Sequence, residues 1–556
     1  MTYEVFHLSP IAHCLPFCKL KLETGISFSG YFLVVYFTEY IKFCDSRDSD
    51  KLPSNVSRFT THFLGERRRV MSIRGVSIWP VAVLTAAFLV LPVAAYALQF
   101  TDITDVAGVG DRGHGKGVAF ADVDGDGDLD LYVSNKGGEN ALYLNDGTGT
   151  FVPAPREAGD RLDDSGMSMG SSFGDIDNDG DQDLYIVKGG RYEIEANRLL
   201  LNENGRFVDV TRKAGVGSKE FTYSAAFADV DNDGFLDIYL ANYGVGAKNT
   251  LYRNNGDGTF SDVTDAAGVG DRSWSWSGVF SDVNGDGFQD LYVVNGRYPA
   301  GEPNHLYLNN GDGTFRDVSR ESGVDDGNWG LGAAFADVDN DGDFDLFVSN
   351  YVGPNKLYLN DGSGIFTDVS EASGLADEGW GKGPSFGDVD HDGDLDLYLG
   401  DCKFANKLYL NDGSGVFTDV TDQYPILKNE TARTKGTAFA DIDNDGDLDL
   451  YVVNWGVSNR LYRNDLNDDR FLKIRLKGTV SNADAVGAKV TVSIGGKLVG
   501  VREVKTLTGF CSQAPLELHF GLPAAGDYQV DVVFPSGLRA AGTYVNGQFI
   551  TIVEGI

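Results

Sequence analysis

Seven acidic nonapeptides recur along the chain at nearly constant spacing. They read DVDGDGDLD, DIDNDGDQD, DVDNDGFLD, DVNGDGFQD, DVDNDGDFD, DVDHDGDLD and DIDNDGDLD, and they begin 51 to 55 residues apart. The first copy has Asp122, Asp124, Asp126 and Asp130 at positions one, three, five and nine, and Gly127 at position six permits a sharp bend. Carboxylates on alternate residues around a glycine supply the hard oxygen ligands that a calcium loop requires.

The acidic loops favour a bound divalent cation over a metal-free turn. Crowded carboxylates repel one another unless a cation or protons neutralise them, and this chain repeats the arrangement seven times. Magnesium is disfavoured, because it retains its water and rarely occupies a cage made only of protein groups. Position seven is Asp in some loops and Phe in others, so we expect its backbone carbonyl to be the ligand. His391, at the variable fourth position of the sixth loop, is expected to be solvated.

The composition narrows the class of partner. The 556 residues include 82 Asp and Glu against 46 Lys and Arg, which gives a formal net charge of −36. A surface this acidic argues against nucleic acid and anionic membranes as partners. Only Cys402 and Cys511 follow residue 97, far apart in the chain, so neither a disulfide framework nor a zinc site is predicted.

Residues 71–97 have the layout of a secretory signal peptide. A basic flank precedes the apolar stretch VSIWPVAVLTAAFLVLPVAAYA, which ends in a small-x-small motif. We expect cleavage after Ala97, no membrane insertion afterwards, and a secreted, periplasmic or cell-surface protein; an uncleaved membrane anchor is the alternative. Residues 1–70 show neither a period nor linker composition, and we interpret them as an extension upstream of a true start at Met71.

Each acidic loop lies inside a unit of four short strand-like segments. In the third unit these are SAAFADVD, DIYLAN, NTLYRN and FSDVT, separated by glycine-containing turns. Four-stranded units repeated four to eight times form a β-propeller, so seven loops predict seven blades over residues 98–464. A solenoid is the alternative, but it needs atypical capping repeats, and the first and last loops are as regular as the others.

The two ends of the repeat region predict how the ring closes. The phrase FTDIT, which begins at Phe100, resembles a fourth strand but has no blade before it. The seventh unit ends after NRLYRND and lacks its own fourth strand. We therefore predict that residues 100–104 complete the seventh blade and remove the open strand edges.

The units resemble FG-GAP repeats, also called VCBS repeats, which form the propeller of integrin α-subunits. The resemblance covers residues 98–464 and implies about seven calcium ions bound on one face of the propeller. It also implies a backbone ligand at position seven and side-chain ligands at positions one, three, five and nine. Loop by loop, these side chains are Asp122, Asp124, Asp126 and Asp130; Asp175, Asp177, Asp179 and Asp183; Asp229, Asp231, Asp233 and Asp237; Asp282, Asn284, Asp286 and Asp290; Asp337, Asp339, Asp341 and Asp345; Asp388, Asp390, Asp392 and Asp396; Asp441, Asp443, Asp445 and Asp449.

Residues 465–556 lack the period and read as a small all-β domain. Runs such as AKVTVSIGG, LELHFGL and QVDVVFPSG are strand-like and are bounded by glycines. SNADAVGAKVTV, GFCSQAPLELHFGL and VVFPSG resemble the ASPIC/UnbV domain, which follows FG-GAP repeats in cartilage-acidic-protein-like secreted proteins of bacteria. The predicted fold is therefore all-β: a seven-bladed propeller followed by a small β-sandwich-like domain.

The face opposite the acidic loops is predicted to be aromatic. If these loops join the first and second strands of each blade, the other strand connections lie on the opposite face. Those connections carry Tyr243, Trp276, Tyr298, Trp329, Tyr351, Trp380 and Trp455, with Lys116, Arg191, Arg297, Lys382 and Lys435 interleaved. Exposed aromatic rings with polar neighbours suit sugar rings or a protein hot spot, so we predict a ligand face. The alternative is that these rings pack between blades and that the cations pair with local carboxylates.

No catalytic residue is predicted. The sequence contains no nucleophile elbow, no His–Asp–Ser constellation and no phosphate-binding glycine loop. We favour a secreted, calcium-binding adhesion or ligand-binding module whose partner is an extracellular protein or glycan. One alternative is a calcium-dependent carbohydrate-active enzyme such as a lyase, with a basic residue facing a calcium-bound uronate. Another is an accessory protein of a secondary-metabolite pathway.

Overall fold

The computed structural model describes two strands within residues 20–41, and residues 98–556 with gaps at 160–161, 190–194, 298–300 and 429–432. The chain divides into two compact units, Met1–Val93 and Ala94–Ile556. In the first unit, β1 (Leu20–Ser29) pairs antiparallel with β2 (Phe32–Ile41). The predicted signal peptide lies outside the described residues. Within the described part of the chain, no helix is long and apolar enough to cross a membrane.

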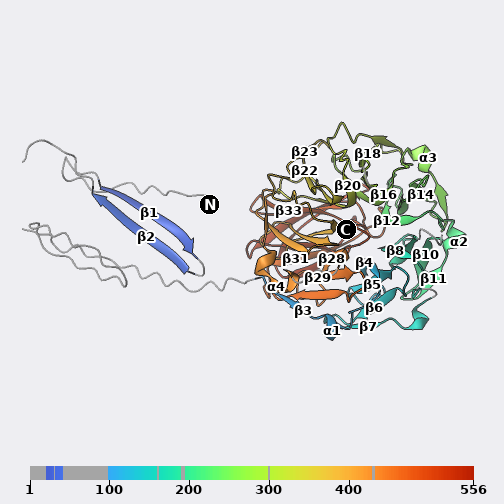
Figure 1. The fold of residues 1–556 in the computed structure, drawn as a ribbon, viewed down its shortest axis with the longest axis horizontal. Helices are drawn as coiled ribbons and strands as arrows, with labels where there is room; N and C mark the ends of the chain where they lie inside the picture. Colours follow the sequence, from blue (N-terminus) through green and yellow to red (C-terminus); the bar gives the residue numbers. More distant parts are fainter. Residues whose placement is uncertain are drawn as a thin grey trace, which may run out of the picture. The chain divides into compact units, whose positions relative to one another are not determined.

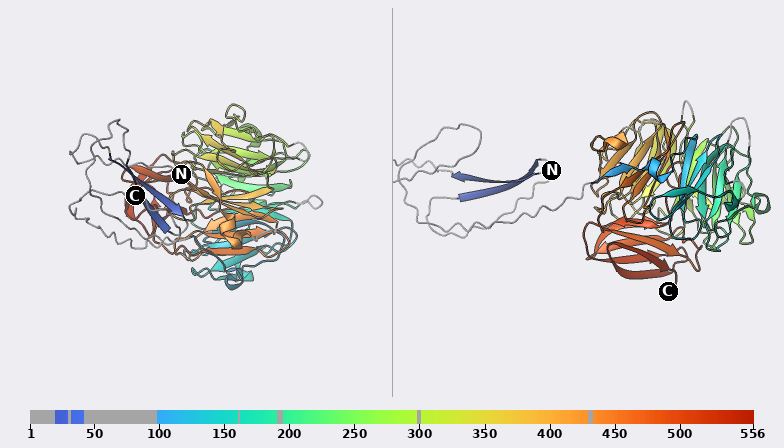
Figure 2. Two further views of the ribbon diagram at one scale, coloured as in Figure 1. Left: turned by 60° about the vertical axis from the view of Figure 1, so that its left-hand side comes forward. Right: turned by 90° about the horizontal axis from the view of Figure 1, so that it is seen from below.

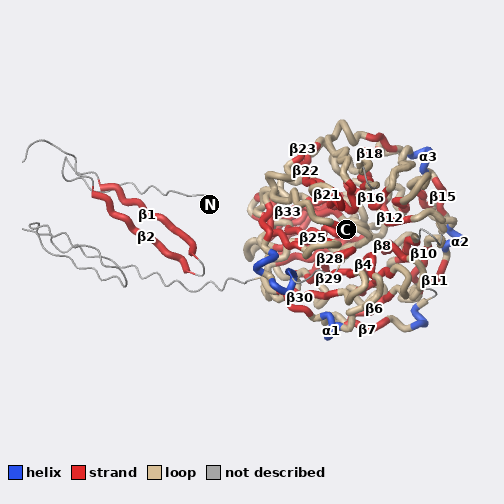
Figure 3. Tube along the Cα trace, in the orientation of Figure 1, coloured by secondary structure: helices blue, strands red, loops and turns tan. Residues whose placement is uncertain are grey.

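Most of the second unit is a ring of seven four-stranded antiparallel sheets, which are the blades of a β-propeller (Figures 1 and 3). In Figure 1 the colour runs around this ring from blue in the first blade to orange in the seventh. The predicted fold class and the predicted number of blades are confirmed.

Each strand of a blade has a counterpart at the same place in every other blade. The first strands surround the propeller axis, since each contacts the first strands of both neighbouring blades. They are β4 (Gly115–Ala121), β8 (Ser168–Gly174), β12 (Thr222–Ala228), β16 (Ser275–Ser281), β20 (Trp329–Ala336), β24 (Gly381–Gly387) and β28 (Thr434–Ala440). The second strands are β5 (Asp130–Asn135), β9 (Asp183–Lys188), β13 (Asp237–Asn242), β17 (Asp290–Asn295), β21 (Asp345–Val352), β25 (Asp396–Asp401) and β29 (Asp449–Asn454).

The outer half of each blade is built from shorter strands. The third strands are β6 (Ala141–Asn145), β10 (Arg198–Asn202), β14 (Thr250–Asn254), β18 (His305–Asn309), β22 (Lys356–Asn360), β26 (Lys407–Asn411) and β30 (Arg460–Asn464). The fourth are β7 (Phe151–Pro153), β11 (Phe207–Asp209), β15 (Phe260–Asp262), β19 (Phe315–Asp317), β23 (Phe366–Asp368), β27 (Phe417–Asp419) and β3 (Phe100–Asp102). Single helical turns occur at α1 (Thr104–Ala107), η1 (Arg156–Ala158), α2 (Thr211–Ala214), α3 (Thr264–Ala267), η2 (Thr421–Gln423) and α4 (Pro425–Lys428).

The ring closes between the two ends of the repeat region. Strand β3 pairs antiparallel with β30, with Phe100 opposite Asn464 and Asp102 opposite Tyr462. Beside this ladder, the backbone N–H of Asp465 donates to the carbonyl of Gln99 at 2.8 Å. The predicted closure is confirmed, although the closing strand ends at Asp102 rather than at residue 104.

Neighbouring blades are joined by the same two contacts all around the ring. An aromatic residue in each second strand meets, edge to face, a Phe in the first strand of the next blade, at centroid distances of 6.1–6.5 Å. The Asn that ends each third strand donates to a carbonyl of the preceding blade; Asn145, for example, reaches Ile442 of the seventh blade at 2.8 Å. Because the chain repeats these residues in every unit, it repeats the interface as well.

The C-terminal domain is a sandwich of two sheets. A three-stranded sheet contains β34 (Leu518–Gly521), β31 (Phe471–Lys477) and β37 (Gln548–Val553), and a four-stranded sheet contains β33 (Lys497–Glu503), β32 (Lys489–Ile494), β35 (Asp527–Val533) and β36 (Arg539–Val545). Leu472, Val490 and Phe520 are fully buried between them. Figure 2, on the right, shows this domain stacked against one face of the propeller.

Residues 504–517 form a loop, here called the axial loop, that runs from the C-terminal domain into the propeller axis. The backbone N–H of Gln513 donates to Val118 in the first blade, and that of Gly509 donates to Ala333 in the fifth. The loop turns at Phe510 and Cys511, which are 0% and 1% exposed. A Cβ on Gly117 would lie 1.9 Å from the carbonyl oxygen of Cys511, so the first strand needs a glycine there.

Candidate metal centres and the opposite face

Each acidic nonapeptide connects the first strand of a blade to the second. In the first blade, β4 ends at Ala121, the loop begins at Asp122, and Asp130 at position nine already belongs to β5. The glycine at position six has a φ between 88° and 101° in all seven loops, a backbone conformation that disfavours side chains. Seven acidic turns therefore lie at the same end of the seven blades, as the sequence predicts.

Most of the loops bring three carboxylates together. Oxygens from positions one, three and nine lie within 4.8 Å of one another in the loops that begin at Asp122, Asp175, Asp229, Asp337 and Asp388. In the fourth loop, Asn284 replaces the aspartate at position three. This geometry brings together three of the four predicted side-chain positions, and it could hold a metal ion.

Several of these oxygens are buried and have no hydrogen-bond donor. They include Oδ1 of Asp231, Asp339, Asp390 and Asp443 at position three, and Oδ2 of Asp337 and Oδ1 of Asp441 at position one. Burial of an unpartnered carboxylate oxygen is unfavourable unless a cation compensates it. The donor set therefore fits a hard cation that prefers oxygen ligands.

The remaining predicted ligand position has a local role. At position five, Oδ1 of Asp126 accepts the backbone N–H of Asp128 at 3.0 Å, and the corresponding bond recurs in the other loops. At position nine, Asp130 accepts the backbone N–H groups of Val123 and Asn145 at 3.0 and 2.8 Å. The closing aspartate thus fixes the loop to the third strand as well as facing the carboxylate cluster.

The carboxylates at position nine are electrostatically strained. Burial raises the pKa of Asp130 to about 7, and it raises the pKa of Asp290 and of Asp345 to about 8. Nearby aspartates of the same loop raise these pKa values further, against backbone hydrogen bonds that lower them. A bound cation would stabilise the charged form of each group.

The C-terminal domain packs against this metal-loop face. Nζ of Lys473 lies 2.7 Å from Oδ2 of Asp441, and Nη1 of Arg475 lies 3.4 Å from Oδ2 of Asp122. At the second loop the domain presents a carboxylate instead, because Asp484 accepts the backbone N–H of Asp175 at 2.7 Å. The domain therefore contacts individual acidic loops through groups of both charges.

The prediction that His391 is solvated is wrong. The sequence predicts a solvated side chain, but His391 is 0% exposed, and its Nδ1 lies 2.9 Å from Oδ1 of Asp468. Asp468 belongs to the segment between the last blade and β31, which passes over the sixth loop. A contact across 77 residues has no local signature in the sequence.

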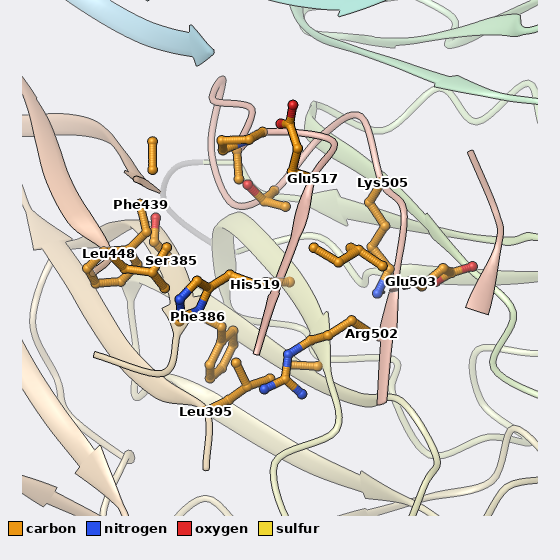
Figure 4. Close-up of a pocket in the computed structure, with 18 of the residues that line it drawn as sticks. Ser385, Phe386, Leu395, Phe439, Leu448, Arg502, Glu503, Lys505, Glu517 and His519 are labelled. Atoms are coloured by element: carbon orange, nitrogen blue, oxygen red, sulfur yellow. Dashed lines mark ion pairs between the residues drawn. The ribbon is translucent and has the colours of Figure 1, made fainter. Parts of the chain in front are cut away.

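A cavity of about 150 Å³ lies where the propeller and the C-terminal domain meet (Figure 4). Its lining is mostly apolar and includes Phe386 and Phe439, and the side chains of Arg502 and His519 point into it. Nε of Arg502 and Nδ1 of His519 are buried without a hydrogen-bond partner. Nε2 of His519 donates to Gly446 at 2.8 Å, which leaves Nδ1 as an acceptor. The lining of the cavity therefore includes an unpartnered donor, Nε of Arg502, and an unpartnered acceptor, Nδ1 of His519.

The predicted ligand-face residues lie at the opposite ends of the strands. Tyr243, Trp329, Tyr351, Trp380 and Trp455 are half-buried, whereas Trp276 is 7% exposed. Tyr298 lies outside the described residues.

The aromatic residues of this face form a continuous belt. The centroid distances are 4.7 Å from Tyr243 to Trp276, 6.1 Å from Trp276 to Trp329, 4.8 Å from Trp329 to Tyr351 and 4.4 Å from Tyr351 to Trp380. The rings thus pack on one another, as the alternative interpretation expects, while most of them remain half-buried.

The chain belongs to the FG-GAP-like repeat family. The profile of this family matches residues 122–186, 189–240, 233–293, 282–348, 337–399 and 402–452, more than half of the chain. A second profile, described as ASPIC and UnbV, matches residues 478–555. Both resemblances drawn from the sequence are confirmed.

Known relatives share this architecture at low identity. Cartilage acidic protein 1 of Homo sapiens is 26% identical over 431 residues, which cover 70% of this chain and 63% of that protein. The protein of the same name from Xenopus tropicalis is 25% identical over 422 residues, 70% of this chain and 65% of its own length. The chain thus spans somewhat less than two thirds of these relatives. A chain in the crystal structure of BBS1N in complex with ARL6DN aligns with a TM-score of 0.41 and 11% identity, over 65% of this chain and 96% of that one.

Sequence analysis missed the axial loop and the basic residues that contact the acidic loops. The motif GFCSQ at residues 509–513 and the glycine of the GKG motif in the first blade were visible signals, since Gly117 accommodates Cys511. Lys473 and Arg475 gave no such signal, because alternating charges are ordinary on a strand with one exposed face.

Proposed function

We propose that this chain is a secreted ligand-binding module whose acidic loops bind calcium and stabilise the propeller, while the opposite face binds an extracellular ligand. The observation that carries the proposal is the asymmetry between the two faces. The C-terminal domain packs on the metal-loop face through Lys473, Arg475 and Asp484. On the other face, aromatic residues such as Trp329 and Trp380 remain half-buried.

Calcium fits the acidic loops better than other common ions. Every side-chain donor in the clusters is an oxygen, which suits calcium and magnesium rather than zinc. Calcium accepts six to eight oxygen ligands in flexible geometry, as a loop with several carboxylates and a backbone carbonyl would supply. Export is supported by the predicted signal peptide at residues 71–97.

The arrangement favours a binding role over the enzymatic alternative. A calcium-dependent lyase would place its uronate substrate at the metal loops, beside a basic residue. In this protein Lys473 and Arg475, which contact Asp441 and Asp122 at those loops, belong to a packed domain interface.

A screen against glycan and protein arrays with calcium present tests the ligand-binding role. Trp329→Ala and Trp380→Ala should weaken binding of any ligand found while leaving the calcium content of the protein unchanged. Val245→Ala, at an 88% exposed position on the same face, is the control and should bind normally. Unfolding of both tryptophan variants, or no ligand in either array, would count against the proposal.

A further inference from the structure

Every blade carries a β-bulge near the start of its first strand, at the end remote from the acidic loop. The pairing with the second strand shifts register there in all seven blades. A bulge redirects a side chain, and bulges are enriched beside functional sites. The residues at the shifts are Lys116, Met169, Tyr223, Trp276, Leu331, Lys382 and Lys435, which we call the axial ring.

The axial ring is divided into two halves. The sixth, seventh and first blades are consecutive in the closed ring, and each contributes a lysine. The other four blades contribute Met169, Tyr223, Trp276 and Leu331. Phe510, at the tip of the axial loop, contacts both halves: its ring centroid lies 4.9 Å from Nζ of Lys382, 6.2 Å from the ring of Tyr223 and 6.3 Å from that of Trp276.

The three lysines lack carboxylate partners. Lys116 and Lys382 are 8% and 7% exposed, and Lys435 is half-buried. Among the residues that the structure describes, none of their ammonium groups lies within 4 Å of a carboxylate. They lie over aromatic rings instead, with Nζ of Lys116 4.8 Å and Nζ of Lys435 6.0 Å from the centroid of Trp455.

A carboxylate that acts on this lysine cluster is occupied elsewhere. Asp401, which acts on Lys382, accepts the backbone N–H groups of Trp380, Lys403 and Phe404 at 2.6 Å each. The other titratable groups with the largest effects on the three lysines are Lys136, Arg433, Cys402 and Cys511. Two of these are cationic and two are thiols, so none supplies a fixed negative charge.

Burial and mutual repulsion lower the pKa values of the lysines. Burial, followed by repulsion from Lys382, lowers the pKa of Lys435 to about 7. Burial and the two neighbouring lysines hold the pKa of Lys116 well below its ordinary value. Uncompensated like charges in a buried cluster are unfavourable, and an anion placed among them relieves both effects. Such perturbed groups are typical of functional sites.

We propose that the axial ring binds a small organic anion, with its carboxylate among Lys116, Lys382 and Lys435 and its flat, apolar body against the aromatic half at Tyr223 and Trp276. This inference rests on the ligand-binding role proposed for the same face and names the chemistry of the ligand. In a chain with a net charge of −36, a cationic ring is the place where an anion would be concentrated.

Calorimetric titration of the calcium-loaded protein with benzoate tests both halves of the ring. We expect saturable one-to-one binding of benzoate, at least tenfold weaker binding of benzyl alcohol, which keeps the ring and lacks the charge, and at least tenfold weaker binding of sulfate, which has charge and no ring. Absence of benzoate binding overturns the proposal. Equal binding of sulfate overturns the role of the aromatic half.

Lysine variants assign the binding to this ring. Lys382→Gln and Lys435→Gln should each weaken benzoate binding at least tenfold. Lys219→Gln, which removes an exposed lysine from the loop leading into the third blade, should leave it unchanged. Equal affinities for all three variants would overturn the assignment.

A pH series on the unmodified protein remains decisive even if a variant fails to fold. Because the protonated form of Lys435 binds the anion, affinity should fall as pH rises through about 7, whereas benzoate keeps its charge throughout. A flat profile contradicts the role of Lys435. Failure of benzoate with a positive array result would reject this inference alone, and the reverse result would reject the array-based function alone.

Discussion

The first strand of each blade has one end at the acidic loop and the other end at the axial ring. The residues at these two ends differ in how much they vary from blade to blade. At the end that leads into the acidic loop, position one is Asp in all seven blades. At the other end, the bulged residue is Lys in three blades and Met, Tyr, Trp or Leu in the rest. The contrast teaches that the loop end performs the same task seven times, whereas the ring end performs one task for which the seven blades supply different parts.

The axial loop links these two ends. It starts from the C-terminal domain on the metal-loop face and turns at Phe510, within the axial ring. Thr506 exchanges hydrogen bonds with the backbone of Phe227, and the side chain of Gln513 does the same with Phe173. The acidic loops, the axial ring and the axial loop that connects them can therefore each be altered separately.

Removal of the cation should have the largest effect. If each carboxylate cluster binds calcium at a hundred times its dissociation constant, each site stabilises the fold by about 2.7 kcal/mol. Chelation with EDTA should then lower Tm by on the order of 10 °C or more, measured by scanning calorimetry. An unchanged Tm would mean that the acidic loops do not hold the propeller together. Restoration by calcium but not by magnesium would identify the ion.

Blocking the axial loop should come next. In Gly117→Ala the new Cβ would lie 1.9 Å from the carbonyl oxygen of Cys511, so the loop or β4 must shift. We expect a loss of about 3 kcal/mol in the free energy of unfolding and faster proteolysis at the C-terminal domain. The control is Gly327→Ala, where the Cβ meets nothing within 4 Å and stability should be unchanged. Equal stability of the two variants would mean that the axial loop does not contribute to the stability of the propeller.

A charge-matched pair within one loop sharpens the assignment of ligands. Asp337→Asn changes position one of the fifth loop, whose Oδ2 is buried without a partner, and should reduce the calcium content by one ion and the stability by about 2–3 kcal/mol. Asp343→Asn changes position seven of the same loop, where we expect the backbone carbonyl to bind, and should leave the calcium content unchanged. Atomic emission measures the content, and an equal loss in both variants would refute the predicted ligand positions.

The smallest effect belongs to a group remote from both ends. Glu554 accepts hydrogen bonds from the backbone N–H groups of Thr479, Val480 and Ser481, and these bonds, with one from Ser536, lower its pKa to about 2. The stability from the charged form is therefore complete above the ordinary glutamate pKa and is lost as pH falls toward 2.

Glu554→Gln should cost on the order of 1–2 kcal/mol near neutral pH, and the difference from the unmodified protein should shrink as the solution is acidified. Urea denaturation at several pH values measures it. Calcium content and anion binding should not change. A change in either would show that the C-terminal domain influences the binding sites of the propeller.

The repeated features of the fold were predictable from the sequence, and the single ones were not. The number of blades, the closure through Phe100 and the position of the acidic loops follow from a period that averages over seven copies. The axial loop occurs once, and its contacts join residues more than 200 positions apart, as in the bond from Ser277 to Gly509. Pairings of this kind depend on the assembled ring and leave no periodic trace.

The burial of side chains in the candidate sites also could not be predicted from the sequence. His391 was expected in solvent because its position varies among the loops, yet the segment after the last blade covers it. The lysines at 116, 382 and 435 were recognised as cations on the ligand face, but their convergence on one ring required the bulges that redirect them. Side-chain direction at a bulge depends on strand register, which a single sequence does not specify.

The closure of the ring also determines how late in synthesis the last pair of propeller strands can form. Among the propeller strands, β3 is made first and its partner β30 is made last. Thr101 and Asp465, which bond to each other beside this ladder, are 364 residues apart. At ordinary rates of translation, the closing strand waits roughly 20 to 70 s for its partner. During that interval the growing propeller exposes unpaired strand edges, which can pair with another chain. The nascent chain is therefore most vulnerable to aggregation just before its last blade is complete.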